Sequence, residues 1–234
     1  MKLIKKIRER WVKRNSQSYI RYLRKAGVKI GENTFIRDPR SFGIDMQRAH
    51  LITIGSDVRF NYNNRLVSHD AAAKVFRSKY LDYLPSNGHI TIGNNVWFAR
   101  NVTVLKGVTI GDNCIIGYGA TVTHDIPADS VAAGTPAKVI CTLDEYYEKR
   151  KKEALQESFE FARGIVERFH RRPVPGDFKE SFVWFVSGKD MDKYPELPFK
   201  HQLGPAYDHY REHHVAKFSS FDDFLVAAWI GNQH

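Results

Sequence analysis

Large apolar residues recur at an interval of six through the middle of this 234-residue chain. An α-helix requires an apolar period near 3.6 residues and a half-buried strand a period of about two, so this repeat is typical of neither. From residue 92 onward, the first set of apolar positions is Ile92, Phe98, Val104, Ile110, Ile116 and Val122. A second set lies four residues after each of these positions: Val96, Val102, Val108, Cys114, Ala120 and Ile126.

A period of six predicts short parallel strands joined by sharp corners, with three repeats forming one triangular coil. The large residues of the first set would fill the interior, and small residues that follow them, such as Gly93 and Gly111, would let the coils stack closely. Each coil would bury its apolar face only against the next coil, which is the organisation of a solenoid. We therefore predict a parallel β-helix over residues 28–143.

The same register occurs earlier in the chain, with two interruptions. Its apolar positions are Ile30, Ile36, Phe42, Ile54, Phe60 and Leu66. Arg48 occupies the remaining position of this series and does not fit an apolar interior. The interval from Leu66 to Ile92 is 26 residues, which six does not divide, so an insertion must lie between them. Residues 69–89 are predicted to form a loop.

The two ends of the chain lack the repeat. Residues 1–27 predict a basic amphipathic helix, because apolar residues fall on one helical face among Lys and Arg. The apolar residues of that face are Leu3, Ile4, Ile7, Trp11 and Val12. Residues 144–234 predict a mostly helical accessory extension, whose last helix begins at Ser220 with Asp223 as its capping partner. Both segments would cover the open ends of the β-helix, which are otherwise free strand edges.

The formal net charge of +10 belongs to one segment of the chain. Residues 1–29 hold eleven Lys and Arg against one acidic residue, and the other 205 residues hold 25 basic and 25 acidic side chains. Two roles fit this segment: a helix that only caps the domain, or a helix that rests on anionic lipid or an acidic glycan. Nucleic acid is not favoured as a partner, because no recognition motif or aromatic-interleaved basic patch occurs.

Composition favours a cytoplasmic protein, with a peripheral position at the inner face of the membrane left open. No apolar stretch approaches the roughly 20 residues that are needed to cross a bilayer. The basic N-terminus is not followed by the apolar core of a signal peptide. The two cysteines, Cys114 and Cys141, lack metal-ligand spacing and suit a reducing compartment.

Three stretches of the chain resemble the hexapeptide-repeat acyltransferase superfamily. They are Ile90-Thr-Ile-Gly-Asn-Asn-Val-Trp97, Gly107-Val-Thr-Ile-Gly-Asp-Asn113 and Ala132-Ala-Gly-Thr-Pro-Ala-Lys-Val-Ile140. Within it, the chain looks most like the sugar and polysaccharide O-acetyltransferases of the galactoside, maltose and capsule type, over roughly residues 28–142. The resemblance implies a left-handed parallel β-helix, acetyl-CoA as acyl donor, a homotrimer, and a sugar or cell-surface polysaccharide precursor as acceptor.

The resemblance also implies a catalytic histidine, which falls on His69, just before the predicted loop. A sugar hydroxyl is too weakly acidic to attack a thioester unaided, and an imidazole that titrates near neutrality can remove its proton. Asp70 would orient or tune His69, or would be a simple turn residue; both alternatives stay open. Asn61 and Asn63 are candidates for the acceptor site, although their position at corners of the repeat explains them more simply. Trp97 is a third candidate, for which packing between subunits is an equal alternative.

Positions that contact the cofactor in the family fall on a defined set of residues here. Side-chain contacts are expected from Arg100, Tyr118, Thr123, His124 and Lys138, and backbone contacts from Ala99, Gly117 and Ala133. Arg100 and Tyr118 are larger than the residues usual in the family, so they would narrow the groove for the pantetheine arm or add a stacking surface for adenine. Lys138 suits a phosphate of coenzyme A, because its ammonium is mobile.

Other functions remain as alternatives. Transfer to the nitrogen of an amino sugar or nucleotide-amino sugar is the nearest, and a non-enzymatic β-helix scaffold belongs to another class. A zinc carbonic anhydrase needs three histidines around one metal, and the histidines of the repeats include no close pair. An H-x-x-E-H pattern from His209 to His213 favours a polar helix face over a zinc site. No metal is expected.

Overall fold

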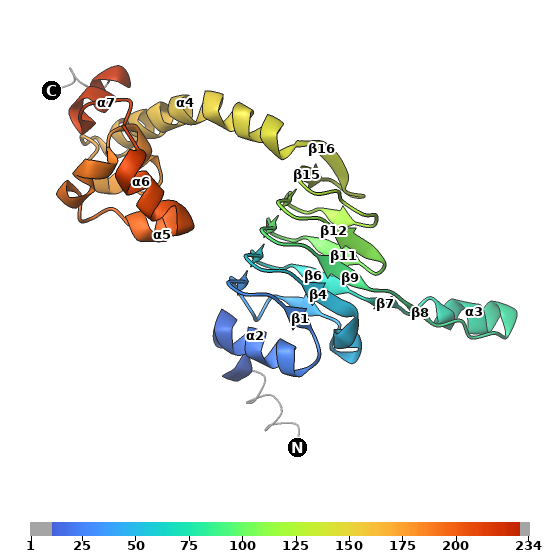
Figure 1. The fold of residues 1–234 in the computed structure, drawn as a ribbon. Helices are drawn as coiled ribbons and strands as arrows, with labels where there is room; N and C mark the ends of the chain where they lie inside the picture. Colours follow the sequence, from blue (N-terminus) through green and yellow to red (C-terminus); the bar gives the residue numbers. More distant parts are fainter. Residues whose placement is uncertain (1–10, 230–234) are drawn as a thin grey trace. The chain divides into compact units, whose positions relative to one another are not determined.

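The structure is a computed structural model that describes residues 11–229. The chain divides into two compact units, Met1–Tyr147 and Glu148–His234. The boundary between them lies inside the long helix α4 (Leu143–Phe169). The first unit is a stack of parallel coils, and the second contains most of α4 together with a cluster of shorter helices (Figure 1). The residues of the N-terminal face that precede Trp11, namely Leu3, Ile4 and Ile7, lie outside the described residues.

Three sheets form the three sides of the coiled unit. The first sheet contains, in sheet order, β1 (Lys29–Ile30), β4 (Ile52–Ile54), β9 (Ile90–Ile92) and β12 (Val108–Ile110). The second sheet contains β2 (Phe35–Ile36), β5 (Arg59–Phe60), β10 (Trp97–Phe98), β13 (Ile115–Ile116), β15 (Ser130–Ala133) and β16 (Lys138–Thr142). The third sheet contains β3 (Gly43–Ile44), β6 (Arg65–Val67), β11 (Thr103–Leu105) and β14 (Thr121–Val122). All pairs in these sheets are parallel except β15 with β16, so the unit is a parallel β-helix.

The interior of this β-helix is built from the two apolar sets of the six-residue repeat. Every member of both sets from Ile92 to Ile126 is buried. Strand pairing confirms the predicted coil of three repeats, because Trp97 pairs with Ile115, 18 residues later. The rings of Phe42, Phe60 and Phe98 lie in successive coils, with centroids 4.9 and 4.6 Å apart.

Glycine follows the large residue of several repeats because neighbouring coils approach closely there. A Cβ atom at Gly55 would lie 2.4 Å from the backbone oxygen of Gly93, and one at Gly93 would lie 2.8 Å from the backbone nitrogen of Asp112. Both distances are too short for a side chain. The small residues noted in the repeat therefore have a packing reason.

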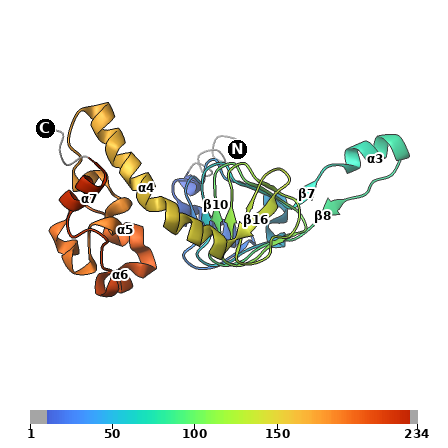
Figure 2. The ribbon, with the colours of Figure 1, turned by 90° about the horizontal axis from the view of Figure 1, so that it is seen from above.

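Both interruptions of the repeat are inserted elements. Arg48 lies in the 3₁₀ segment η1 (Met46–Leu51), which bulges between β3 and β4, so it never had to enter the interior. The prediction of a simple loop over residues 69–89 is wrong, because the segment contains β7 (His69–Asp70), helix α3 (Ala73–Tyr80) and β8 (Ser86–Asn87). β7 and β8 pair antiparallel and form the root of an arm that carries α3 away from the coils (Figure 2).

The N-terminal end of the β-helix is covered by helix α2 (Ser16–Lys25). Its buried face contributes Tyr19, Ile20 and Leu23 to the same core as the repeat residues. Ser16 accepts a hydrogen bond at Oγ from the backbone N–H of Ile36, 2.9 Å away, which satisfies one donor at the end of the stack. The described part of the basic segment therefore caps the β-helix through α2, whereas Trp11 of the predicted apolar face is exposed, and contact of the segment with anionic lipid stays a prediction.

The second unit has its own aromatic core. Its rings include Phe178, Phe185 and Phe224, whose centroids lie 5.3 to 6.0 Å apart. Besides part of α4, this unit contains η2 (Pro175–Asp177), η3 (Ser181–Trp184), η4 (Gly188–Lys193), α5 (Phe199–Leu203), η5 (Gly204–Ala206), α6 (Tyr207–His213) and α7 (Phe221–Ala227). Ser220 caps α7 by accepting from the N–H of Asp223, which confirms the predicted start of the last helix. Among residues 11–229, no helix is both long and apolar enough to span a bilayer.

Candidate active site

His69 follows β6 at one edge of the β-helix and has a carboxylate partner that the sequence analysis did not identify. The register of β3 and β6 places Ile44 beside Leu66, so Asp45 lies next to the turn that leads to His69. The backbone N–H of Asp45 donates to the carbonyl oxygen of Leu66 at 3.2 Å. Oδ2 of Asp45 is hydrogen-bonded to Nδ1 of His69, and it also accepts from Oγ of Ser68 at 2.9 Å.

The surroundings of Asp45 keep its carboxyl group ionised. Its side chain is only 7% exposed, and burial by itself would raise its pKa. Hydrogen bonds from Ser68 and His69 outweigh burial, so the pKa of Asp45 lies below its usual value. An ionised acceptor at Nδ1 favours the tautomer in which Nδ1 carries the proton and Nε2 is free to accept one. The His69 side chain is 33% exposed, so the ring remains accessible from solvent.

Asp70 has a different role from Asp45. Its Oδ2 forms an ion pair with Nζ of Lys106, and its Oδ1 accepts from the N–H of Ala72 at 3.0 Å. The hydrogen bond from Lys106, followed by those from Ala72 and Ser86, lowers the pKa of Asp70 to about 2. Asp70 therefore ties the root of the arm to the neighbouring coil. Asp45, and not Asp70, is the carboxylate hydrogen-bonded to the His69 ring.

Two predicted cofactor residues share the edge of His69. We call this edge, formed by the corners after β6, β11 and β14, the His69 edge. Leu66 pairs with Val104, which pairs with Val122, so Thr123 and His124 follow on the same edge two coils away. At about 4.8 Å per coil this corresponds to roughly 10 Å. Oγ1 of Thr123 and Nδ1 of His124 are 2.8 Å apart.

Most of the other predicted residues line one pocket of about 540 Å³. We call it the Arg100 pocket. It is lined by Asn61, Trp97, Ala99, Arg100, Ile115, Gly117, Tyr118, Val131, Ala133, Ile140 and Tyr146. Five predicted cofactor positions, between Ala99 and Ala133, thus lie together with two predicted acceptor positions. Trp97 comes two residues before Ala99, whereas Asn61 comes from an earlier coil.

Contacts of the two large side chains hold them at this pocket. The guanidinium of Arg100 lies 4.8 Å from the ring centroid of Tyr62, in a cation–π arrangement. The hydroxyl of Tyr118 accepts from Nδ2 of Asn101 at 2.8 Å. Gly117 lines the same pocket and has no room for a side chain, because a Cβ atom there would lie 2.8 Å from Cβ of Ala133.

Besides Thr123 and His124, two further predicted binding residues do not line the Arg100 pocket. Asn63 has a left-handed backbone, with φ at 60°, and its N–H donates to Oγ of Ser41 at 3.1 Å, as expected of a corner residue. Lys138 lies exposed on β16, where it pairs with Ala133 across the antiparallel ladder. Both residues belong to the coiled unit, but neither reaches this pocket.

The His69 edge and the Arg100 pocket lie on different edges of the β-helix. The chain passes from the first sheet to the second and then to the third in every coil. Arg100 and Tyr118 occupy corners between the second and third sheets, whereas His69 and Thr123 follow the third sheet. The width of the third sheet separates the two groups within one chain.

The zinc-like pattern of the second unit has a structural explanation in α6. The rings of His209 and His213 stack with their centroids 4.6 Å apart, and Nδ1 of His213 is 3.0 Å from the carbonyl oxygen of His209. Over residues 11–229, no group of three or more His, Cys, Asp or Glu side chains is placed to hold a metal ion.

Comparison with known proteins agrees with the hexapeptide-repeat class that the six-residue repeat and the parallel β-helix indicate. The family model described as bacterial transferase hexapeptide (six repeats) matches residues 89–124. Protein CapG of Staphylococcus aureus is 37% identical over 130 residues, which are 54% of this chain and 73% of that protein. The chain belongs to the bacterial hexapeptide-repeat transferases.

Further relatives carry acetyltransferase names. Galactoside O-acetyltransferase of Escherichia coli is 35% identical over 122 residues, or 51% of this chain, and the chain spans only 56% of that relative. Among solved structures, an acetyltransferase from Vibrio cholerae complexed with acetyl-coenzyme A matches at 27% identity with a TM-score of 0.43, over 50% of this chain and 61% of that one. A galactoside acetyltransferase in complex with coenzyme A matches at 26% identity with a TM-score of 0.37, over 54% and 70%.

Proposed function

We propose that this protein transfers an acetyl group from acetyl-CoA to a hydroxyl of a sugar or of a cell-surface polysaccharide precursor. The observation that carries the proposal is the pair formed by His69 and Asp45 at an edge of a hexapeptide-repeat β-helix. Membership of a transferase family and the relatives named as O-acetyltransferases support the reaction class. The proposal includes the left-handed sense of the coil.

In the proposed mechanism, Nε2 of His69 removes the proton of the acceptor hydroxyl as its oxygen attacks the thioester carbonyl carbon. The tetrahedral intermediate collapses with cleavage of the C–S bond, and the imidazolium returns the proton to the departing thiolate. No covalent enzyme intermediate is needed, because the thioester is already activated. Ionised Asp45 holds the ring and stabilises its positive charge while the intermediate exists.

The Arg100 pocket is the proposed site for part of coenzyme A. Its small floor residues, Gly117 and Ala133, leave backbone groups accessible to an extended pantetheine arm. Arg100 carries a guanidinium suited to a phosphate, and Tyr118, a residue that is 68% exposed, offers its ring for stacking. Lys138 does not line this pocket but pairs with Ala133, which does, and it stays a proposed contact for a phosphate of coenzyme A.

The separation of the His69 edge from the Arg100 pocket supports a homotrimer. We propose that each site combines His69 of one subunit with the Arg100 pocket of its neighbour. One heterologous contact used three times closes a ring and leaves no free interface. The two free cysteines support a cytoplasmic location, and the basic segment supports peripheral contact with an anionic membrane.

The proposal is tested by incubating the protein with acetyl-CoA and a panel of acceptors. The panel contains monosaccharides, oligosaccharides, amino sugars and serine, and the readouts are coenzyme A release and the mass of the product. We expect O-acetylation of at least one saccharide. Acetylation of amino groups alone would show that the acceptor is an amino sugar and not a hydroxyl. No coenzyme A release and no acetylated product with any acceptor would contradict the proposal.

A further inference from the structure

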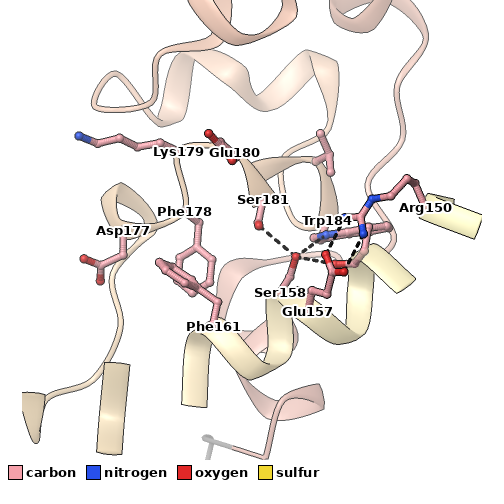
Figure 3. A pocket seen from close by; sticks show the side chains of 12 residues that line it. Arg150, Glu157, Ser158, Phe161, Asp177, Phe178, Lys179, Glu180, Ser181 and Trp184 are labelled. Carbon is pink, nitrogen blue, oxygen red and sulfur yellow. Dashed lines mark hydrogen bonds and ion pairs between the residues drawn. The ribbon is translucent and has the colours of Figure 1, made fainter. Parts of the chain in front are cut away.

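The second unit contains a pocket that lies outside the region matched to the transferase family. It has a volume of about 450 Å³ and is lined by residues of α4, η2 and η3 together with the residues between the two 3₁₀ segments (Figure 3). Its side chains belong entirely to residues 150–184. Ligand pockets usually range from roughly 300 to 1,000 Å³, so this one is large enough for one or two sugar rings.

One wall of this pocket is aromatic and firmly supported. The ring of Phe161 on α4 packs edge-on against buried Phe178, with centroids 5.3 Å apart and an angle of 84° between planes. Phe178 in turn belongs to the core of the unit, whereas 51% of Phe161 is exposed. Phe161 therefore presents an open apolar surface on a rigid base.

A second wall is fixed by hydrogen bonds around a buried hydroxyl. Nε1 of Trp184 donates to Oγ of Ser158 at 2.9 Å, and Ser158 is also 3.0 Å from Oγ of Ser181 (Figure 3). The serine hydroxyl is further anchored to the carbonyl oxygen of Ala154 at 2.8 Å. The indole is thus held in one orientation before any ligand arrives, which lowers the entropic cost of binding.

The charges of the pocket nearly cancel. Arg150 is paired with Glu157 through two hydrogen bonds of 2.7 and 2.6 Å, and Asp177 is paired with Arg171. The remaining charged residues are one cation and one anion, Lys179 and Glu180, which are adjacent in sequence and exposed. A site of this kind has no excess of positive charge for a phosphate or of negative charge for an amine.

We propose that this pocket binds a neutral saccharide unit. The apolar C–H face of a sugar ring fits against Phe161 and Trp184. Its hydroxyls meet both hydrogen-bond donors and acceptors, which are the hydroxyl of Ser181, the guanidinium of Arg150 and the carboxylate of Glu157. The site is separate from the proposed acetyl-transfer site and the inference does not rest on acetyl transfer. The second unit is then a saccharide-binding module joined to a transferase.

The test follows the indole N–H signal of Trp184 in the ¹⁵N-labelled full chain by NMR. The chain has four tryptophans, and the variant Trp184→Phe assigns the signal. The probes are methyl β-galactoside, methyl β-N-acetylglucosaminide and maltotriose at millimolar concentration, with inorganic phosphate as the charged comparison. We expect at least one saccharide to shift the Trp184 signal saturably, and phosphate to leave it unchanged.

Matched variants locate the binding. Phe161→Ala should weaken the saccharide about tenfold, as expected for the loss of one aromatic contact, and Phe161→Leu should weaken it while keeping apolar bulk. Phe169→Ala removes another exposed ring of the same helix and should leave binding unchanged. Saccharide shifts confined to other tryptophans, a Trp184 response to phosphate alone, equal binding by Phe161→Ala and Phe169→Ala, or no response to any saccharide would overturn the proposal.

Discussion

Nδ1 of His69 is hydrogen-bonded to Oδ2 of Asp45, a carboxylate 24 residues earlier in the chain and one coil below. The carboxylate is almost fully buried, whereas the imidazole reaches solvent. A buried anion behind an accessible ring is suited to hold that ring and to stabilise it when it takes up a proton. The account of catalysis therefore depends on Asp45 as well as on His69.

Replacing Asp45 tests this positioning role. Asp45→Asn should lower kcat by roughly 10²-fold or more, because the amide neither fixes the tautomer nor stabilises the imidazolium. The KM for acetyl-CoA should stay near that of the wild type, since Asp45 does not line the Arg100 pocket. Steady-state kinetics measure both quantities, and Asp45→Glu should recover part of kcat. A merely structural carboxylate would change both parameters together or neither.

The ion pair of Asp70 and Lys106 should control the arm in a pH-dependent manner. Because the pKa of Asp70 is lowered from 3.8 to about 2, its contribution is fully present above pH 3.8 and is lost as the pH falls through 2. Lys106→Met should accelerate hydrogen exchange of the Ala72 amide, which donates to Asp70. Lys74→Met, which changes a lysine on the arm itself that does not pair with Asp70, is the control. Equal exchange in both variants at neutral pH would show that the ion pair does not hold the arm.

The column of phenylalanines should dominate the stability of the β-helix. Phe60→Ala opens a cavity between Phe42 and Phe98 and should lower the free energy of unfolding by about 3–5 kcal/mol. Phe35→Ala removes a 39% exposed ring from the same sheet and should cost far less. Urea titrations of both variants measure the difference. Similar losses would indicate that the interior rings are not tightly packed.

Mixing two inactive variants tests whether sites are shared between subunits. If His69 of one subunit faces the Arg100 pocket of the next, His69→Ala and Arg100→Glu should regenerate some complete sites after subunit exchange. The measurement is activity of the mixture against each parent, with the molar mass from light scattering. A fully active monomer, or exchange without any recovery of activity, would place both residues in the site of one chain.

The repeating part of the fold could be predicted from the sequence, because every coil needs apolar residues at the same interior positions. Ile92, Phe98 and Val104 occupy three sides of one coil, and the same types return 18 residues later. Inserted elements break that counting. Ile44 and Leu66 are neighbours in register but lie 22 residues apart, because η1 lengthens their coil, and this shift concealed Asp45 as the partner of His69.

The structures of the arm and of the second unit could not be predicted from a periodic pattern of apolar residues. Helix α3 has only eight residues and buries only Ala73, so its sequence is too short for an apolar period to distinguish it from a loop. The family resemblance predicts Gly117 and Tyr118 as cofactor contacts and Trp97 as an acceptor contact, but it does not predict that the three residues line one pocket. The pocket of Phe161 and Trp184 depends on contacts between α4 and η3 that no local pattern encodes.

The most direct test of the account is the rate of saccharide-dependent coenzyme A release by His69→Ala and by wild-type protein. The account predicts a loss of about 10²–10⁴-fold in turnover, because the acceptor hydroxyl loses its base. Binding of coenzyme A, measured by calorimetry on the same variant, should be unchanged and shows that the fold is intact. Turnover near that of the wild type in His69→Ala would contradict the assignment of His69 as the catalytic base.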